Sequence, residues 1–127
     1  MEKYLDQNAQ ADSKIIVEGP VRSEKFEINP NHLIYARSAG NYLDLYIEVG
    51  AGVRKLTKRL SLSTFATYFH EQKQILRIHN SYIANLDKIK QVSGNAAGLT
   101  LKFKSIAEII IPVSSKYIKK VEGILQK

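Results

Sequence analysis

Alternation of apolar and polar residues with a period of two dominates the first half of the chain and predicts β-strands. The pattern is clearest over residues 42–49, where every second residue is apolar: Leu43, Leu45, Ile47 and Val49. Shorter stretches with the same pattern, bounded by turn residues, predict strands over residues 14–18, 24–28, 33–38 and 53–60. The sequence GAG at residues 50–52 predicts a hairpin between two of these strands.

Helical spacing of apolar residues occurs at two places. One helix is expected over residues 62–69 with Ser61 as its N-cap, and another is expected at the end of the chain with Ser114 as its cap. Between them, residues 88–92, 99–103 and 107–113 return to the strand pattern around a turn at residues 94–98. The inner stripes of the helices are Leu62, Phe65 and Phe69 in the first, and Ile118, Val121 and Leu125 in the second.

The length and composition favour one folded domain. A chain of 127 residues has room for one core, and its 44% hydrophobic content is too high for a disordered polymer. Residues 1–14 are polar and without a period, so we expect a tail or a linker remnant there and the domain over residues 15–127. No apolar run is long enough for a secretion signal or a membrane span, and a cytoplasmic location is therefore expected.

The charge balance points to an anionic partner. Nineteen Lys and Arg residues against twelve Asp and Glu give a net charge of +7, which attracts polyanions or acidic membrane surfaces. The chain contains no cysteine, which excludes disulfides and thiol-based metal sites.

Residues with the potential for enzymatic chemistry are few. His79 and Ser81 share a strand face but have no evident orienting carboxylate, and the His70-Glu71 pair lacks a second histidine at ligand spacing. The glycines in GNAAG at residues 94–98 match no phosphate-binding pattern and fit a hairpin turn. We therefore expect no enzyme, no metal, no cofactor and no small-molecule substrate.

The segment RIHNSYIAN at residues 77–85 is unusually polar for a strand. Alternation buries Leu76 and Ile78 and leaves Arg77 and His79 on the opposite side, while Asn80 stands where the chain bends. Arginine pairs with guanine and asparagine with adenine, so these side chains are candidates for DNA contacts. The alternatives are a surface cation for Arg77, a hydrogen-bonded structural histidine for His79 and a turn former for Asn80.

Two other segments have similar side chains. RSAGN at residues 37–41 places Arg37 and Asn41 around a glycine between two strands, where the alternative is a plain hairpin turn. SSK at residues 114–116 combines two hydroxyls and a cation at a helix N-terminus, which suits a phosphate, although a cap alone would need only Ser114.

The order and spacing of these motifs resemble the LytTR family of bacterial DNA-binding domains over residues 15–127. The resemblance rests on Asn41-Tyr42, Arg77-x-His79-x-Ser81-Tyr82, Asn85 and Pro112-Val113-Ser114-x-x-Tyr117. It implies a mostly β fold, an elongated stack of antiparallel sheets with two short helices, that contacts DNA through loops inserted into its grooves. Such domains are usually the output half of response regulators in two-component systems and bind tandem promoter repeats.

By this resemblance the contact loops fall on Asn41, Asn80 and Ser115. The family commonly has arginine at the last two positions, so the base preference is expected to differ and the Ser115 contact to shift to Lys116. Arg37 stands where an acid is usual and adds a cation near the first loop. Ser81 and Asn85 are expected to hold the turn through side chain to backbone hydrogen bonds. The predicted DNA-binding residues are Arg37, Asn41, Arg77, His79, Asn80, Ser115 and Lys116.

The expected partner is double-stranded DNA, with the input supplied by a receiver domain, a membrane sensor domain or a sensor kinase that these residues do not contain. The chain has no long apolar heptad and is expected to be mainly monomeric. The alternative function is a small β domain that binds RNA or an acidic protein partner without base-specific contacts.

Overall fold

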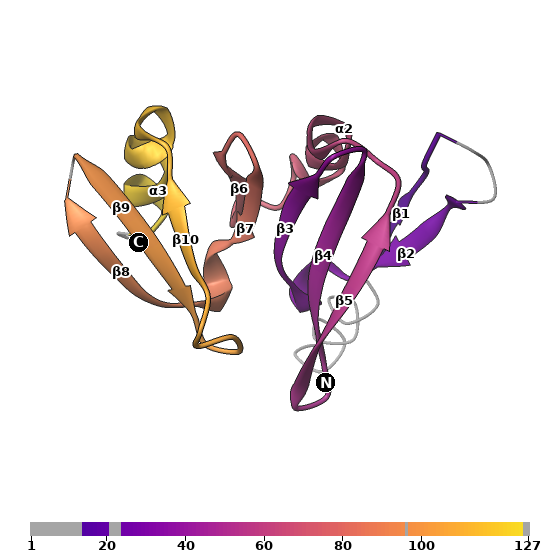
Figure 1. Ribbon diagram of the computed structural model, residues 1–127, viewed down its shortest axis with the longest axis horizontal. Coiled ribbons are helices and arrows are strands. Elements are labelled where there is room, and N and C mark those ends of the chain that lie inside the picture. Colours follow the sequence, from indigo (N-terminus) through magenta and orange to yellow (C-terminus); the bar gives the residue numbers. More distant parts are fainter. Residues whose placement is uncertain (1–13, 21–23, 96, 126–127) are drawn as a thin grey trace, which may run out of the picture.

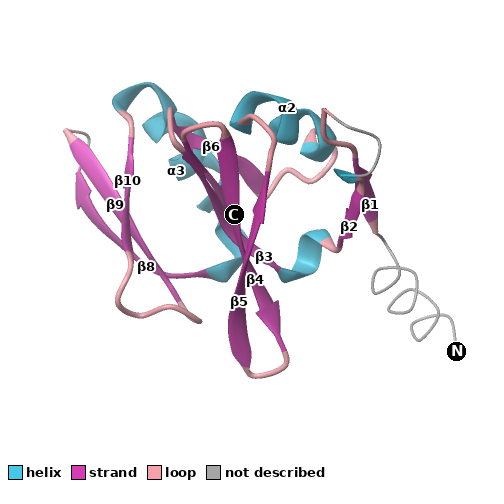
Figure 2. Ribbon diagram, turned by 45° about the vertical axis from the view of Figure 1, so that its right-hand side comes forward, coloured by secondary structure: helices cyan, strands magenta, loops and turns pink. Residues whose placement is uncertain are grey.

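The computed structural model describes residues 14–20, 24–95 and 97–125, which form mainly antiparallel β-strands (Figures 1 and 2). The tail predicted over residues 1–14 lies, except for Lys14, outside the described residues. The strands are β1 (Ile15–Val17), β2 (Phe26–Ile28), β3 (Leu33–Ala39), β4 (Tyr42–Val49), β5 (Gly52–Lys58), β6 (Ile75–His79), β7 (Tyr82–Asn85), β8 (Ile89–Asn95), β9 (Gly98–Phe103) and β10 (Ile110–Val113). The helices are α2 (Leu62–Ala66) and α3 (Ile118–Leu125), with 3-10 helices η2 (Pro30–His32), η3 (Thr67–Phe69), η4 (Leu86–Lys88) and η5 (Ser115–Tyr117).

The strands form three antiparallel sheets. A five-stranded sheet with the order β5-β4-β3-β7-β6 occupies the centre, β1 and β2 form a two-stranded sheet, and β10-β9-β8 form a three-stranded sheet. Figure 1 shows the sheets following one another along the long axis of the molecule, with the two helices at the upper edge. The predicted fold class, an elongated stack of antiparallel sheets with two short helices, is confirmed.

The helices differ from the prediction in how they begin and end. Ser61 caps α2 as expected, because its Oγ accepts a 3.0 Å hydrogen bond from the Thr64 N–H, but the helix tightens into η3 after Ala66. Ser114 stands at the cap position of η5 without a side-chain capping bond, and α3 begins only at Ile118. Neither helix, nor any other in the described residues, has the length and apolar content that a membrane span requires.

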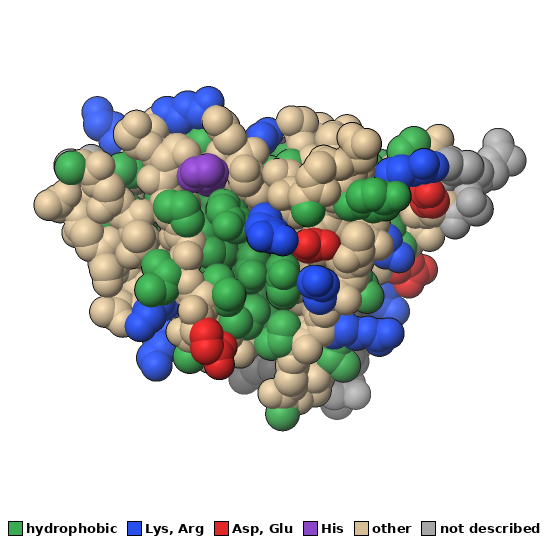
Figure 3. Space-filling model, in the orientation of Figure 1, with side chains coloured by type: hydrophobic (Ala, Val, Ile, Leu, Met, Phe, Trp, Pro, Cys, Tyr) green, Lys and Arg blue, Asp and Glu red, His purple; other side chains and the backbone are tan. Residues whose placement is uncertain are grey.

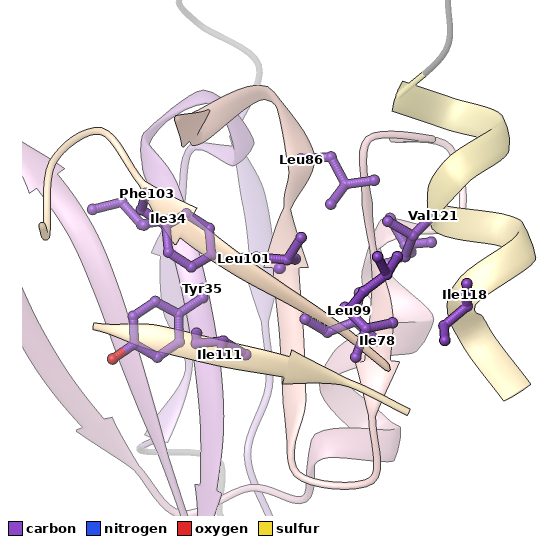
Figure 4. Close-up of a cluster of buried hydrophobic side chains, with 13 residues drawn as sticks. Ile34, Tyr35, Ile78, Leu86, Leu99, Leu101, Phe103, Ile111, Ile118 and Val121 are labelled. Atoms are coloured by element: carbon purple, nitrogen blue, oxygen red, sulfur yellow. The ribbon is translucent and has the colours of Figure 1, made fainter. Parts of the chain in front are cut away.

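Two buried clusters form the core. The first, between the central sheet, the β1–β2 pair and α2, contains Val17, Leu33, Leu43, Leu45, Phe65, Phe69 and Ile83. The second lies between β3, β6, the three-stranded sheet and α3 (Figure 4), and contains Ile34, Tyr35, Ile78, Leu101, Phe103, Ile111, Ile118 and Val121. Each fully buried side chain of this size stabilises the fold by roughly 1.5–3 kcal/mol. The second cluster therefore fixes α3 and η5 relative to β6.

Contacts across the boundary between the central and the three-stranded sheets are aromatic and ionic. The Tyr35 ring on β3 stacks on Phe103 of β9 with 5.4 Å between centroids, and its other stacking partner, at 4.3 Å, is Tyr46 on the neighbouring strand of the central sheet. Glu48 on β4 accepts hydrogen bonds from Lys88 Nζ at 2.9 Å and Ser105 Oγ at 2.7 Å. Partial burial alone would raise the pKa of Glu48, but the bonds from Lys88 and Ser105 outweigh it and lower the pKa. These contacts hold the two sheets in one arrangement.

Candidate nucleic-acid interface

Three turns that are far apart in the sequence meet at one edge of the molecule, the upper edge in Figure 1. They are the β3–β4 turn at residues 40–41, the β6–β7 turn at residues 80–81 and the start of η5. The Ser38 N–H donates to the Ser81 carbonyl at 3.0 Å, which joins the first turn to the second. The Ser114 N–H donates to the Ile78 carbonyl at 2.8 Å, which joins the second turn to η5. The backbone itself therefore sets the spacing between the turns.

The β3–β4 turn is a tight hairpin connection. Ala39 pairs with Tyr42 across it, and Gly40 adopts a φ of 64°, a left-handed conformation in which glycine carries no steric penalty. Asn41 follows at the tip and is exposed. Asn41 therefore lies at the tip of this turn, as predicted, and a short connection carries its amide.

Arg37 lies opposite Asp44 on the neighbouring strand rather than free at the turn. Its Nη2 lies 3.3 Å from Asp44 Oδ2, and Thr57 Oγ1 donates to Asp44 Oδ1 at 2.8 Å. The bond from Thr57 lowers the pKa of the buried Asp44 carboxyl, burial opposes this, and the bond from Arg37 adds to the lowering. Arg37 thus balances a buried carboxylate while about half of its side chain remains exposed, 45% of the reference area.

The Arg77 guanidinium braces the β6–β7 turn through three hydrogen bonds. Its Nη2 donates to the Asn80 carbonyl at 2.8 Å, its Nε to the His79 carbonyl at 3.3 Å, and its Nη1 to Ser63 Oγ on α2 at 2.9 Å. One guanidinium therefore connects two consecutive carbonyls of the turn to the neighbouring helix. This geometry favours a bracing role over a freely projecting cation.

His79 is also bonded within the turn, whereas Asn80 is exposed at its tip. The Ser81 N–H donates to His79 Nδ1 at 3.1 Å, so Nδ1 carries no proton in this arrangement. The His79 and Tyr82 rings pack edge to face, with 5.5 Å between their centroids. The structural interpretation of His79 fits these contacts. Asn80 is exposed between two residues that are held in place.

At the third position, Ser115 and Lys116 are both exposed in η5. Lys116 Nζ lies 5.3 Å from the centre of the Tyr117 ring, a cation–π distance. On the face shown in Figure 3, lysine and arginine side chains lie above α3 at the same edge, without acidic side chains among them. This end of the edge attracts anions.

Two supporting residues were not anticipated from the sequence, and two expected roles were partly wrong. Asp44 binds Arg37, and the register of β3 with β4 brings the two together. Ser63 binds Arg77, and the packing of α2 brings these two together. Ser81 acts through its backbone, by the bonds to His79 and Ser38. Asn85 does bond to backbone, but at the other end of β7, where it accepts from the Asp87 N–H of η4 and donates to the carbonyls of Pro30 in η2 and Leu33 at the start of β3.

The described residues contain no group of three or more histidine and acidic side chains that could hold a metal ion. The exposed side chains at the three turns, Asn41, Asn80, Ser115 and Lys116, are amide, hydroxyl and cationic groups, which match the hydrogen-bonding and charge pattern of nucleic acid.

Comparison with known proteins gave one family and a structural neighbour. A family model described as the LytTr DNA-binding domain matches residues 23–126. The fold is similar to the LytTr DNA-binding domain of a Bacillus cereus protein described as a methyl-accepting/DNA response regulator, with a TM-score of 0.66 and 19% sequence identity. The likeness covers 89% of this chain and 98% of that one. No curated protein sequence matched the chain.

Proposed function

Because the chain belongs to the LytTr DNA-binding domain family, we propose that it binds specific sequences in duplex DNA for a bacterial transcriptional regulator. The observation that carries this proposal is the alignment of three turns along one edge, joined by backbone hydrogen bonds. A fixed row of exposed polar side chains suits DNA recognition, because groups held in place lose little entropy when they bind.

In this proposal Asn41 and Asn80 read base edges. An asparagine amide offers a donor and an acceptor side by side, which matches the N6 and N7 groups of adenine in the major groove. Both residues are exposed at the tips of tight turns. They supply sequence preference rather than general attraction.

Ser115 and Lys116 contact the phosphate backbone. A hydroxyl and an ammonium at the start of η5 bind phosphate oxygens and neutralise charge, whatever the base sequence. Arg77 and His79 act mainly by holding the β6–β7 turn. Arg37 balances the Asp44 carboxylate, and its exposed part adds positive charge near the β3–β4 turn.

The loops, rather than a helix, enter the grooves. The helix α2 spans only five residues, and α3 buries Ile118 and Val121 against the core. The elongated edge presents its turns along one face of the duplex, in a domain that we place at residues 15–127. Tandem promoter repeats would then be occupied by one domain each.

We place this activity in the bacterial cytoplasm, under the control of a receiver domain, a membrane sensor domain or a sensor kinase. The structural neighbour is described as a response regulator, which supports an input of this kind.

Selection of bound sequences from random duplexes tests the proposal. We expect a defined consensus and, by fluorescence anisotropy, at least about tenfold tighter binding to it than to shuffled duplex at 150 mM salt. Single-stranded RNA that competes equally well at the same salt concentration, or a selection without consensus, would contradict it.

A further inference from the structure

A groove outside the row of turns lies between η3, β6 and α3. Figures 1 and 2 show α2 and α3 on either side of β6, and the cavity between them has a volume of about 510 Å³. This volume falls within the range of about 300–1,000 Å³ that is usual for small-molecule sites.

The floor of the groove is apolar. Phe69, Ile75, Leu76 and Ile83 line it, and each is buried in the core. Ala66 and Ile124 extend the apolar lining on the two helical sides. A surface of this kind binds the hydrocarbon part of a ligand, whereas a DNA phosphate would gain nothing from it.

The rim of the groove is cationic. Lys73, Arg77 and Lys120 line it together with His70, and no acidic side chain is among the lining residues. The hydrogen bonds of Arg77 go to two carbonyls and a hydroxyl, which leave its charge without a counterion among the described residues. Three cations over an apolar floor require an anion for charge complementarity.

We propose that this groove is a binding site for a small amphiphilic anion, a carboxylate or sulfonate carried on an apolar chain or ring system. The apolar body lies on Phe69, Ile75 and Leu76, and the acidic group lies at the rim between Lys120 and Arg77. A protein partner fits less well, because a stable protein interface involves about 20–30 residues on each side, and eleven residues line this groove.

The site is connected to the row of turns through Arg77. The same guanidinium that lines the groove binds the Asn80 and His79 carbonyls. An anion at the rim competes for these donors and loosens the β6–β7 turn. Bound ligand therefore weakens DNA binding, a consequence that rests on the proposed function.

The probe is 8-anilinonaphthalene-1-sulfonate, and the control is N-phenyl-1-naphthylamine, which has the same rings without the sulfonate. Both are titrated by fluorescence into the full chain without DNA. Lys120→Glu is compared with Lys119→Glu, because the neighbouring Lys119 is exposed on the same helix but does not line the groove. Thermal melts verify that both variants remain folded.

We expect saturable binding of the sulfonate dye, weakened about fivefold or more by Lys120→Glu and less than about twofold by Lys119→Glu. The neutral dye should respond to neither substitution. Equal effects of the two substitutions on the sulfonate dye, or saturable binding of neither dye, would overturn the site.

A second titration measures the affinity for the selected duplex at a saturating concentration of the sulfonate dye. We expect weaker DNA binding in the wild type and no change in Lys120→Glu. Unchanged DNA affinity in the wild type would overturn the coupling. A chain that binds the dye but no duplex would refute the proposed function and leave the ligand site standing, since the dye titration does not depend on DNA.

Discussion

Arg77 donates a 2.8 Å hydrogen bond to the backbone carbonyl of Asn80, three residues further along the chain. The main chain of the exposed residue is therefore held by a side chain from the strand that leads into the turn. Since the same guanidinium reaches Ser63 on α2, the position of the turn depends on the position of the helix.

Replacing Arg77 should damage the turn rather than remove one phosphate contact. Arg77→Ala removes three donor contacts. A hydrogen bond from a charged donor contributes about 1.5–3 kcal/mol, but the bonds to Ser63 and Asn80 are exposed, and water replaces much of their contribution when the arginine is removed. We expect a loss of about 2 kcal/mol in urea unfolding and faster amide exchange at residues 79–81. Arg77→Lys should restore little of this, because an ammonium cannot reproduce the planar set of donors.

The control for this prediction is Arg54→Ala, which removes an exposed arginine from β5. Stability equal to wild type in Arg77→Ala, with exchange unchanged at residues 79–81, would show that the guanidinium does not brace the turn.

Stability should fall in acid partly because of Asp44. Its pKa is lowered in the folded state, chiefly by the Thr57 hydroxyl and, against the effect of burial, also by Arg37. A lowered carboxyl pKa stabilises the fold above the unfolded value of about 4, and this contribution disappears as the pH falls through the folded-state pKa. Asp44→Asn should therefore lose less stability than wild type between pH 7 and pH 3, as measured by urea midpoints.

Glu122→Gln removes an exposed carboxyl from α3 and should leave the pH dependence as in wild type. An identical pH dependence in Asp44→Asn and wild type would mean that Asp44 is not the source of the acid sensitivity.

Regular alternation and helical stripes allowed much of the fold to be predicted from the sequence. Leu43 and Leu45 are buried on β4, and Leu62, Phe65 and Phe69 are buried on the first helix and its 3-10 extension. Val49, in contrast, is 53% exposed despite its place in the alternation. Figure 1 shows why, since the β4–β5 hairpin projects beyond the rest of the sheet and leaves no core against its end.

Features that depend on tertiary contacts were predicted less well. The expected strand over residues 107–113 begins only at Ile110, after a turn at residues 107–108. At Ser114 the chain is still bonded to β6 through its N–H, and the helix is delayed to Ile118. No local pattern contains this bond, because its acceptor lies 36 residues away, at Ile78 (114 − 78).

In the candidate site too, the features set by local sequence were predictable and those set by tertiary contacts were not. Turn residues made the exposed positions of Asn41 and Asn80 predictable. For Arg77 the sequence left a DNA contact and a surface cation open, and for the segment of Arg37 a DNA contact and a plain hairpin turn. The supporting contacts of both arginines were not predicted, because their partners Asp44 and Ser63 come from the register of β3 with β4 and from the docking of α2.

DNA binding should weaken steeply with salt. If about five to eight phosphates are neutralised by the basic groups of this +7 chain, the plot of log affinity against log salt has a slope on the order of −4 to −7. Anisotropy titrations between 50 and 300 mM KCl measure the slope. A slope near −1 would indicate that the basic surface does not follow the DNA backbone.

The central claim is that the β6–β7 turn specifies sequence while η5 supplies attraction. Lys116→Ala, as the loss of a phosphate contact, should weaken binding to all duplexes alike and reduce the salt slope by about one unit. Lys104→Ala is its matched control, because Lys104 is exposed in the loop between β9 and β10, at the opposite edge in Figure 1.

The most direct measurement is the affinity of Asn80→Ala for the selected duplex and for shuffled duplex. Wild type and Asn31→Ala are measured beside it, because Asn31 lies in η2, which precedes β3 at the end of that strand away from the β3–β4 turn. The account predicts a loss of about 1–3 kcal/mol on the selected duplex, little change on the shuffled one, and flattened preference at one base position. Melting temperatures matched to wild type establish that the turn is intact. An Asn80→Ala variant with the wild-type melting temperature and full sequence preference would contradict the claim and leave Asn80 as a turn residue only.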